Sequence, residues 1–349
     1  MKNRTEEVYI GIDLGDRKHQ MCVTNQQGEI IAEEKIANDR PALSQYVRRF
    51  PKAQVFLEVG THSPWVSRFL EQLGWRVTVA NARKLRAIYN NERKSDRLDA
   101  QMLAKLGRVD PQLLHPVHHG SASAQQDLLW IKLRDQAVSC RTKLISSINS
   151  SLKSLGYRIG GGSAASYLKR LDRDLKSECR PMVEPMIEVL RSLNEQIKFY
   201  DRMIEELTAT KYPECQRLMQ IHGVGPITAL CFVLKLERPE RFAKLRDVGP
   251  YLGLCPKRDQ SGEMDKQLPI SKRGDAYLRR LLVSCAHYVL GPFGPDSALR
   301  DFGQRLSERG GARAKKRAVV AVARKLSVLL LKLWREPVHY QPYPEGVTV

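Results

Sequence analysis

The stretch Val8 to Asp13 reads V-Y-I-G-I-D, a run of apolar residues that stops on a carboxylate. β-Branched and aromatic residues in such a run predict a central strand that is covered on both faces. Gly11 has no side chain, so it leaves room for another segment to approach the backbone closely. Asp13 has two interpretations at this point: a strand end that faces solvent, or a carboxylate with a function.

The residues after Asp13 alternate between strand and helix patterns. A turn at residues 26–28 joins two further strands, and helical spacing then alternates with short apolar runs. The order β-β-β-α-β-α-β-α predicts an α/β domain with a mixed five-stranded sheet. In such a sheet the first and fourth strands lie side by side and parallel, so Asp13 and Glu58 emerge at the same carboxyl edge. The predicted strands are 8–13, 18–25, 29–36, 54–58 and 76–80, and the predicted helices are 41–50 and 65–73.

Two more acids follow in the segment K-S-D-R-L-D-A. Asp96 and Asp99 are three residues apart, which places both on one face of the first turn of a helix that Ser95 or Asp96 caps. Acids in a first turn also interact favourably with the helix dipole, which is a purely structural explanation. The basic residues interspersed with these acids are Arg93, Lys94 and Arg97. Carboxylates of this kind suit Mg²⁺, as one ion or as two about 4 Å apart, with Mn²⁺ as a substitute.

Composition narrows the class of partner. A formal charge of +20 in 349 residues favours a polyanion, with nucleic acid ahead of an anionic membrane. The apolar stretch 318–334 contains three cations, so it predicts an amphipathic helix and no membrane span. Seven cysteines without a C-x-x-C pair indicate reduced thiols in a cytoplasm. His115, His118 and His119 have no further ligand at metal-binding spacing, so they predict a loop.

Three N-terminal motifs resemble a known family. Y-I-G-I-D, F-L-E-V-G-T and K-S-D-R-L-D-A are similar to the DEDD signature of insertion-sequence transposases of the 110/1111 group, which are related to the Piv DNA invertase. The resemblance extends over most of the chain. It implies an RNase H-like (RuvC-like) N-terminal domain in which Asp13, Glu58, Asp96 and Asp99 are the metal-site acids. It also implies a bacterial, nucleoid-associated protein that acts on DNA.

The middle of the chain predicts a helical linker. Residues 121–155 are helical and basic, and Gly160 to Gly162 predict a flexible joint. Beyond Pro185, apolar residues recur at alternating steps of three and four, which predicts a coiled coil and self-association as a dimer or tetramer. The alternative is one amphipathic helix packed on its own domain, whereas the family's coiled-coil linker agrees with self-association. The seam residues are Met186, Leu190, Leu193, Ile197, Tyr200, Ile204 and Leu207.

The C-terminal part predicts a mainly helical domain. The turn H-G-V-G-P around Gly223 and Gly225 is typical of a helix-hairpin-helix, where backbone N–H groups bind phosphate, although such turns also simply join helices. Ser261 lies in a predicted loop, and chemistry alone favours an ordinary turn residue because no histidine base is beside it. The last segment predicts a basic loop, an amphipathic helix and a poorly ordered tail. The basic residues expected to contact nucleic acid are Lys257, Arg258, Lys272, Arg273, Arg279, Arg280, Arg313, Lys315, Lys316 and Arg317.

The resemblance changes the interpretation of Ser261. The runs G-L-C-P, S-G and I-S-K-R-G-D-A-Y-L-R-R-L-L are similar to the C-terminal transposase domain of the same family, and Ser261 falls on its catalytic serine. This implies attack on DNA, a covalent phosphoserine link, and a composite site completed by the acids and Mg²⁺. It further implies a non-coding guide RNA from the element. Glu263 and Asp265 depart from the basic residues of relatives, while Ser271, a competing nucleophile, matches the family's structural S-K-R-G turn.

These observations divide the chain into a RuvC-like domain (1–110), a helical linker (111–212), a transposase domain (213–337) and a tail (338–349). The preferred function is a DNA transposase or recombinase of a mobile element. One alternative is a RuvC-like nuclease or junction resolvase that uses metal-activated water, with Ser261 structural. The other is a non-catalytic nucleic-acid-binding protein, which would not need to retain all four acids and the serine.

Overall fold

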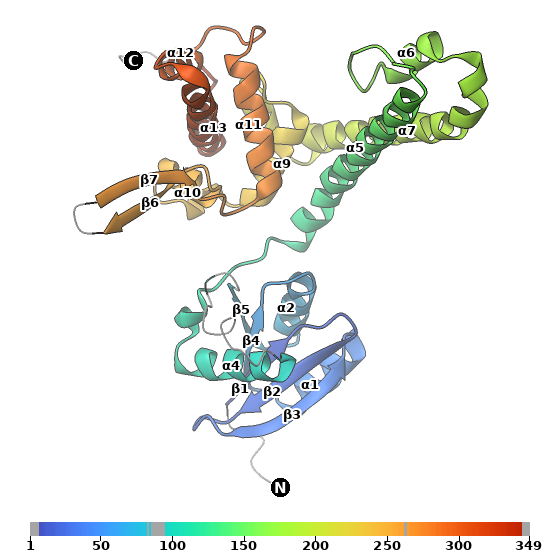
Figure 1. The fold of residues 1–349 in the computed structure, drawn as a ribbon. Coiled ribbons are helices and arrows are strands. Elements are labelled where there is room, and N and C mark those ends of the chain that lie inside the picture. Colours follow the sequence, from blue (N-terminus) through green and yellow to red (C-terminus); the bar gives the residue numbers. More distant parts are fainter. Residues whose placement is uncertain (1–6, 82–83, 85–94, 262–263, 344–349) are drawn as a thin grey trace. The chain divides into compact units, whose positions relative to one another are not determined.

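The computed structural model describes residues 7–81, 84, 95–261 and 264–343. The chain forms two compact units, unit 1 (Met1–Ala122) and unit 2 (Ser123–Val349). Figure 1 shows the helices and strands of each unit. In the part of the chain that the structure describes, no helix is long and apolar enough to cross a membrane. Residues 123–212 of the predicted helical linker lie in unit 2 together with the predicted C-terminal domain, and residues 111–122 lie in unit 1.

Unit 1 contains the predicted mixed sheet, with strand order β3-β2-β1-β4-β5. β1 is antiparallel to β2 and parallel to β4, and β4 is parallel to β5. The five-stranded sheet and the pairing of the first and fourth strands are therefore confirmed. The strands are β1 (Val8–Asp13), β2 (Lys18–Thr24), β3 (Ile30–Ala37), β4 (Ala53–Glu58) and β5 (Arg76–Ala80).

Helices cover both faces of this sheet (Figure 1). α1 (Arg40–Arg49) and α2 (Ser63–Gln72) pack against one face, in a core that contains Ile10, Ile12 and Val55. α4 (Asp96–Val109) lies on the other face, where Ala100 and Ala104 form a buried cluster with Cys22. The strands are thus buried on both sides, as an unbroken apolar run requires.

Glycine allows α4 to come this close to the sheet. A Cβ atom on Gly11 would lie 1.9 Å from the Ala100 carbonyl oxygen, so only glycine fits at this position of β1. Gly107 has the complementary role on the helix, because its Cβ would lie 2.3 Å from the Phe56 ring. The close approach predicted at Gly11 is confirmed, and the approaching segment is α4.

Unit 2 begins with two long helices, α5 (Ala122–Ser154) and α7 (Arg180–Thr210), which pack antiparallel. Lys211 near the end of α7 donates to Asp127 near the start of α5 at 2.6 Å. Arg134 donates to Asp201 at 2.9 Å, and Arg141 donates to Asn194 at 3.0 Å. Successive residues along α5 thus pair with residues of decreasing number along α7, as expected for antiparallel helices. The short helix α6 (Tyr167–Asp174) closes the far end with its own apolar core.

The heptad seam predicted on α7 is used within the chain. Leu190, Ile197 and Ile204 are buried, whereas Met186, predicted as a seam residue, is 46% exposed and Ile187 is buried in its place. The pattern is explained by α5, so it gives no evidence of a second copy, and the oligomer stays a prediction.

Gly160 to Gly162 lie in the connection between α5 and α6, and tertiary contacts hold this connection in place. The Gly160 amide donates to Asp174 at 2.9 Å, and Arg170 donates to the Gly160 carbonyl at 2.9 Å. The glycines where the sequence predicts a flexible joint therefore lie inside unit 2, in the connection that closes the α5–α7 hairpin.

The rest of unit 2 is a helical domain with one small β-hairpin. Its largest core includes Leu230, Phe232, Leu282 and Leu326, and also Ile131 of α5 and Ile204 of α7. The helices are α8 (Glu214–Leu218), α9 (Pro226–Leu236), α10 (Val248–Tyr251), α11 (Ala276–Leu290), α12 (Ala298–Ser307) and α13 (Gly311–Arg335), and the strands are β6 (Pro256–Ser261) and β7 (Met264–Ile270). Short 3-10 helices span Pro111–Leu114, Ser177–Cys179, Pro239–Arg241 and Leu245–Asp247.

Two predictions for the end of the chain are wrong. The basic residues from Arg313 to Arg317 lie on the first turns of α13, which begins at Gly311, and not in a loop before it. The start of the tail is also ordered. The Tyr340 amide donates to Gln220 at 2.8 Å, and the Ala298 amide donates to the Pro342 carbonyl at 3.0 Å.

Candidate active site

Strand register places two of the predicted acids next to each other. Ile12 of β1 pairs with Leu57 of β4, so Asp13 and Glu58 follow as the last residues of two parallel neighbours. Side chains alternate along a strand, so Asp13 shares a face with Gly11, and Glu58 shares a face with Phe56. Gly11 and Phe56 both contact α4. The two carboxylates, each half-buried, therefore lie on the face of the sheet that α4 covers.

The first turn of α4 lies at the same edge. Asp13 pairs with Gln20, and Gln20 pairs with Lys35, which forms one row across three strands. The ammonium of Lys35 lies 4.0 Å from the Asp96 carboxylate, so the start of α4 lies beside this row. The other end of α4 is at the opposite edge, where Arg108 donates to the Gln26 carbonyl. The four acids thus come from one face and one edge of the sheet.

The α4 start is fixed by an N-cap. The Ser95 hydroxyl accepts from the Leu98 amide at 3.3 Å, which identifies Ser95 as the cap and leaves both acids in the first turn. Arg97 binds Glu33 on β3 and holds the pKa of that carboxyl below its usual value. Arg97 thus braces the helix against the sheet. Arg93 and Lys94, predicted beside the acids, lie outside the described residues.

The four acids are gathered at one edge but do not close around a metal position. Among the described residues, no group of three or more His, Cys, Asp or Glu side chains is arranged to hold a metal ion. Oxygen donors alone fit Mg²⁺, which is commonly bound by one or two carboxylates together with water and substrate phosphates. The donor set therefore suits a site that a phosphodiester completes.

His62, which none of the sequence motifs above singles out, joins the two loops that follow β1 and β4. Trp65 Nε1 donates to His62 Nδ1 at 3.2 Å, so the proton of His62 is on Nε2, which donates to Asp16 at 3.0 Å. Asp16 lies in the turn after Asp13, and His62 lies just before α2. The contact connects the segments that follow β1 and β4. The available signal was H-S-P-W immediately after E-V-G-T.

Ser261 lies in the second unit, at the end of β6. β6 and β7 form an antiparallel hairpin in which Ser261 pairs with Met264. The sequence predicts a loop here because P-K-R-D-Q-S lacks the apolar alternation of a strand. The structure corrects this prediction and places Ser261 at the last described position before the tip of a two-stranded hairpin.

The base of the hairpin is tightly packed. Gly253 has φ +70°, and a Cβ there would lie 2.1 Å from the Arg273 carbonyl oxygen. Ser271 accepts from the Arg273 amide at 3.4 Å, which agrees with a turn residue. Arg279 donates to the carbonyls of Leu252 and Arg273 at 3.1 and 2.9 Å. The S-K-R-G turn therefore forms the base of the hairpin. The hydrogen bonds from Arg279 stabilise this turn.

The predicted basic contacts divide into two groups. Arg280 is committed to the fold, because it donates to both carboxylate oxygens of Asp135 at 2.8 Å. Lys257, Lys272 and Arg273 are exposed around the hairpin. The four cations at the start of α13 are exposed too, and cations at a helix N-terminus oppose the helix dipole. An anion bound there would remove this conflict.

Comparison with known proteins decides the family. A model of transposases of the DEDD type matches residues 10–156, and a model described as the IS116/IS110/IS902 transposase family matches residues 215–299. The first match includes the acid edge of unit 1, and the second includes the hairpin of unit 2. The chain belongs to the IS110 family of transposases.

Three relatives illustrate this similarity. A transposase for insertion sequence element IS1111A of Coxiella burnetii is 29% identical over 80% of this chain and 77% of its own length. A transposase for element IS1328 of Yersinia enterocolitica is 28% identical over 80% of this chain and 83% of its own length. A probable family 20 transposase of Pseudomonas aeruginosa is 24% identical over the same shares.

The transposase also contains the predicted helix-hairpin-helix-like turn between α8 and α9. Gly223 has φ +91°, and its backbone packs against the Tyr288 ring, so this glycine is required by the fold. Gly225 is the N-cap of α9, and a Cβ there would meet nothing within 4 Å. Of the two glycines, only Gly225 therefore offers an open approach to the backbone.

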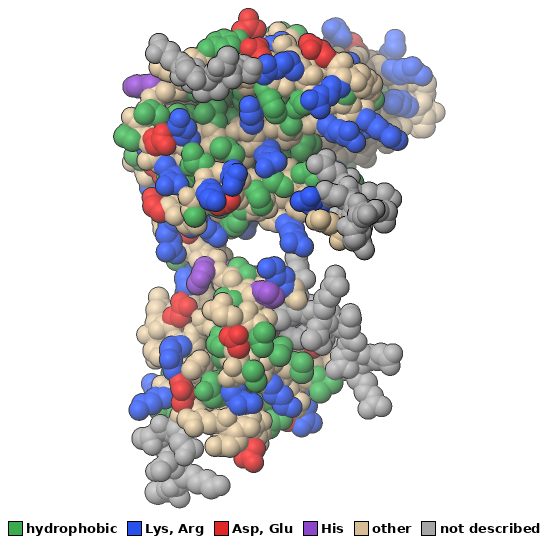
Figure 2. All heavy atoms as spheres, turned by 90° about the vertical axis from the view of Figure 1, so that its left-hand side faces the viewer, with side chains coloured by type: hydrophobic (Ala, Val, Ile, Leu, Met, Phe, Trp, Pro, Cys, Tyr) green, Lys and Arg blue, Asp and Glu red, His purple; other side chains and the backbone are tan. Residues whose placement is uncertain are grey.

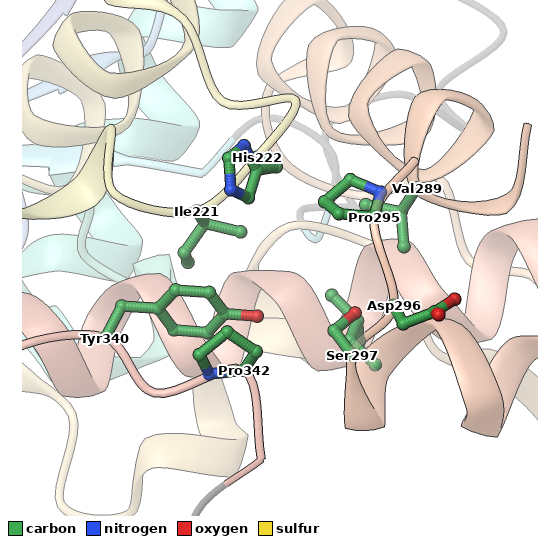
Figure 3. Close-up of a pocket in the computed structure, with 9 residues that line it drawn as sticks. Ile221, His222, Val289, Pro295, Asp296, Ser297, Tyr340 and Pro342 are labelled. Carbon is green, nitrogen blue, oxygen red and sulfur yellow. The ribbon is translucent and has the colours of Figure 1, made fainter. Parts of the chain in front are cut away.

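Residues 338–343 of the predicted tail pack beside this turn. Figure 3 shows Tyr340 and Pro342 facing Ile221 and His222, with the Tyr340 hydroxyl directed toward Ser297. Burial raises the pKa of Tyr340 above its usual value. Residues 338–343, assigned to a tail by sequence, are therefore part of the folded domain.

Proposed function

We propose that this transposase cuts and rejoins DNA through Ser261, with Mg²⁺ held by Asp13, Glu58, Asp96 and Asp99. The observation that carries the proposal is that the strand register brings Asp13 and Glu58 to one edge of the sheet and that the first turn of α4, with Asp96 and Asp99, lies at the same edge, in a chain that belongs to a transposase family. Two strand ends and one helix turn supply only oxygen donors, which is the chemistry that Mg²⁺ prefers.

The covalent step balances as a transesterification. The Ser261 oxygen forms a bond to phosphorus while the bond to one DNA oxygen breaks, and the serine proton leaves as the departing oxygen gains one. Rejoining reverses the step, with a DNA hydroxyl as the attacking group. When bound, Mg²⁺ neutralises phosphate charge and favours loss of the serine proton. Lys257, Lys272 and Arg273 around the hairpin provide positive charge for the DNA backbone.

The wider DNA path would follow exposed positive charge. The cations at the start of α13 and the open backbone at Gly225 are suited to contact phosphates without reading bases. Guidance by an element-encoded RNA and assembly of a dimer or tetramer belong to the same proposal and rest on the family resemblance. The heptad pattern of α7 lends the oligomer no support, because α5 occupies it.

A covalent adduct tests the proposal. The protein is incubated with DNA carrying the element end and Mg²⁺, and protein–DNA adducts are trapped by denaturation. We expect an adduct with the parent and with Ser271→Ala, and a loss of at least about 10³-fold with Ser261→Ala and with Asp13→Asn. Cleavage that survives Ser261→Ala without an adduct would identify a water-using nuclease. A folded parent that binds but never cuts would identify a binding protein.

The RNA component has its own test. Nucleic acid that copurifies with the protein is sequenced after nuclease trimming, with an Arg313→Glu/Lys316→Glu variant as the comparison. We expect one dominant RNA species that maps beside the gene, and reduced recovery with the variant. A random RNA population would contradict guidance while leaving the adduct result untouched.

A further inference from the structure

α12, α13 and the foot of the β6–β7 hairpin enclose an open groove of about 1060 Å³ in unit 2. Phe302 of α12 and Val320, Val328 and Leu329 of α13 contribute to its floor, and Ile270 lines it at the foot of the hairpin. Figure 2 shows hydrophobic side chains interspersed with Lys and Arg on the side of unit 2 that carries these elements. The described residues that line the groove all belong to unit 2, whereas the acid edge belongs to unit 1.

The floor of this groove is the second apolar face of α13. The first face is fully buried and includes Val322, Leu326 and Leu330, which pack into the main core. Val320 and Leu329, in contrast, lie in the groove and are only partly covered. A helix that is apolar on two faces is normally buried on both. Something of matching shape would complete the packing of α13.

The rim of the groove has one sign of charge. Among the described residues that line it, none is Asp or Glu. The Lys325 ammonium lies 3.9 Å from the centre of the Phe302 ring, so positive charge and apolar floor adjoin directly. The six cations are Arg246, Lys316, Arg317, Arg324, Lys325 and Lys332. Charge complementarity therefore calls for an occupant with negative groups beside an apolar stripe.

We propose that this groove binds an amphipathic helix of a partner protein, with an apolar stripe on the α12–α13 floor and acidic residues against the rim. Two packed helices form a groove that a third helix fills by ridge-into-groove packing. Nucleic acid would use the cations but would leave the aliphatic floor uncovered, since protein–DNA interfaces are polar. This proposal does not depend on the chemistry of Ser261.

The occupant would also contact the hairpin. Leu268 and Ile270 of β7 line the groove, and the same strand pairs with Ser261 at its other end. A helix seated here would brace the hairpin against α13. The partner would thus act on the element that carries the proposed nucleophile, without entering the catalytic site itself.

Fluorescence anisotropy with defined peptides tests the proposal on the full chain. The probe is a labelled helical peptide of about four turns with a leucine stripe flanked by glutamates, and the comparison peptides have lysine in place of glutamate or a scrambled order. We expect saturable binding of the acidic helix only. We expect Lys325→Glu/Lys332→Glu to weaken it about tenfold, because two attractive charges become repulsive. Lys153→Glu/Arg309→Glu, an equal charge change at two exposed positions outside the groove, should leave it unchanged.

Hydrogen exchange locates the binding. The acidic peptide should protect residues 298–306 and 316–332, and Val320→Lys should abolish this protection if circular dichroism shows that the variant is folded. Equal binding of scrambled and helical peptides would overturn the proposal. It would also fail if a single-stranded oligonucleotide displaced the peptide and lost affinity equally with the rim variant. Dissociation of an oligomer by the rim variant would instead assign the groove to a second copy of the chain.

Discussion

The acid edge of unit 1 and the β6–β7 hairpin of unit 2 place their proposed catalytic residues in opposite ways. Asp13 and Glu58 end buried strands in the middle of a five-stranded sheet, with helices on both faces. Ser261 ends a strand of a two-stranded hairpin whose base is held by hydrogen bonds from the Ser271 and Lys272 amides to Cys255 and Gly253. A buried sheet fixes side-chain positions by packing, whereas an isolated two-stranded hairpin is marginally stable by itself.

This difference suggests a division of labour. The proposed metal site needs carboxylates that start from one edge of the sheet, and the register of β1 and β4 brings Asp13 and Glu58 to that edge without a ligand. The serine must reach a phosphate and later release it, so a projecting hairpin with a firm base suits it. Changes at the edge should therefore affect folding and chemistry together, while changes at the hairpin tip should affect chemistry alone.

The largest effect is expected at Gly11. Gly11→Ala would place a Cβ atom 1.9 Å from the Ala100 carbonyl oxygen, so α4 must shift and take Asp96 and Asp99 with it. We expect the free energy of unfolding to fall by about 3 kcal/mol or more, and cleavage to be lost. Urea denaturation measures the first. Gly60→Ala, where a Cβ meets nothing within 4 Å, is the control and should change it by less than about 0.5 kcal/mol. A Gly11→Ala protein as stable as the parent would contradict the packing argument.

A second effect concerns acid stability near the edge. His19 is fully buried in β2, and its burial, together with the electrostatic effect of His62 when that ring is protonated, lowers its pKa to about 4. The unfolded chain has a value near 6.5, so it binds the proton more readily. The contribution of His19 to the free energy of unfolding is therefore fully present above pH 6.5. It is lost as the pH falls toward 4, by up to about 3 kcal/mol. Urea titrations at pH 7.5 and 5 should show a smaller difference for His19→Asn than for the parent or for the exposed His222→Gln. An unchanged difference in His19→Asn would assign the acid sensitivity elsewhere.

A smaller effect, on the salt dependence of DNA binding, distinguishes one lysine from one arginine near the hairpin. Lys272 is exposed, whereas Arg280 is paired with Asp135. Lys272→Ala should reduce the slope of log affinity for DNA against log salt by about 1 if Lys272 contacts a phosphate. Arg280→Ala should leave the slope unchanged and lower thermal stability slightly. Equal slope changes would mean that the Asp135 pair opens on DNA.

The smallest effect is expected at the hairpin tip. Ser261→Ala should change the free energy of unfolding by less than about 0.5 kcal/mol, because Ser261 ends a two-stranded sheet outside the main core. Differential scanning calorimetry of the parent and the variant provides the comparison. A large loss of stability would show that the tip is part of the folded core, and the contrast between the two regions would disappear.

The sequence was sufficient for the acid edge because local patterns determine it. The run V-Y-I-G-I-D, the hairpin turn at Gly28 and the Ser95 cap each specify their own element, and the right-handed crossover rule then fixes the strand order. Gly11 predicted the close approach of another segment, which the structure identifies as α4. This order predicts that Asp13 and Glu58 emerge at one edge, whereas the functional interpretation of Asp13 rests on the family resemblance.

The remaining features depend on contacts between distant residues. The heptad pattern on α7 does not say whether its partner is α5 or another chain, since both bury the same face. The strand at Ser261 carries charged residues that hide its pairing with β7. The ion pair between Arg280 and Asp135 joins residues 145 positions apart, so no local sequence pattern predicts it. The hydrogen bond between His62 and Asp16 is equally invisible, because each residue alone has the pattern of an ordinary loop.

The α5–α7 hairpin has a mechanical consequence. A 31-residue helix such as α7 is about 46 Å long, and α5 stiffens it along its length by hydrogen bonds and ion pairs. One end is embedded in the main core of unit 2, and the other carries the separate small core around α6. The pair is therefore a lever arm of fixed length. A force applied at the α6 end would be delivered to the domain that holds Ser261, as a rotation with little bending.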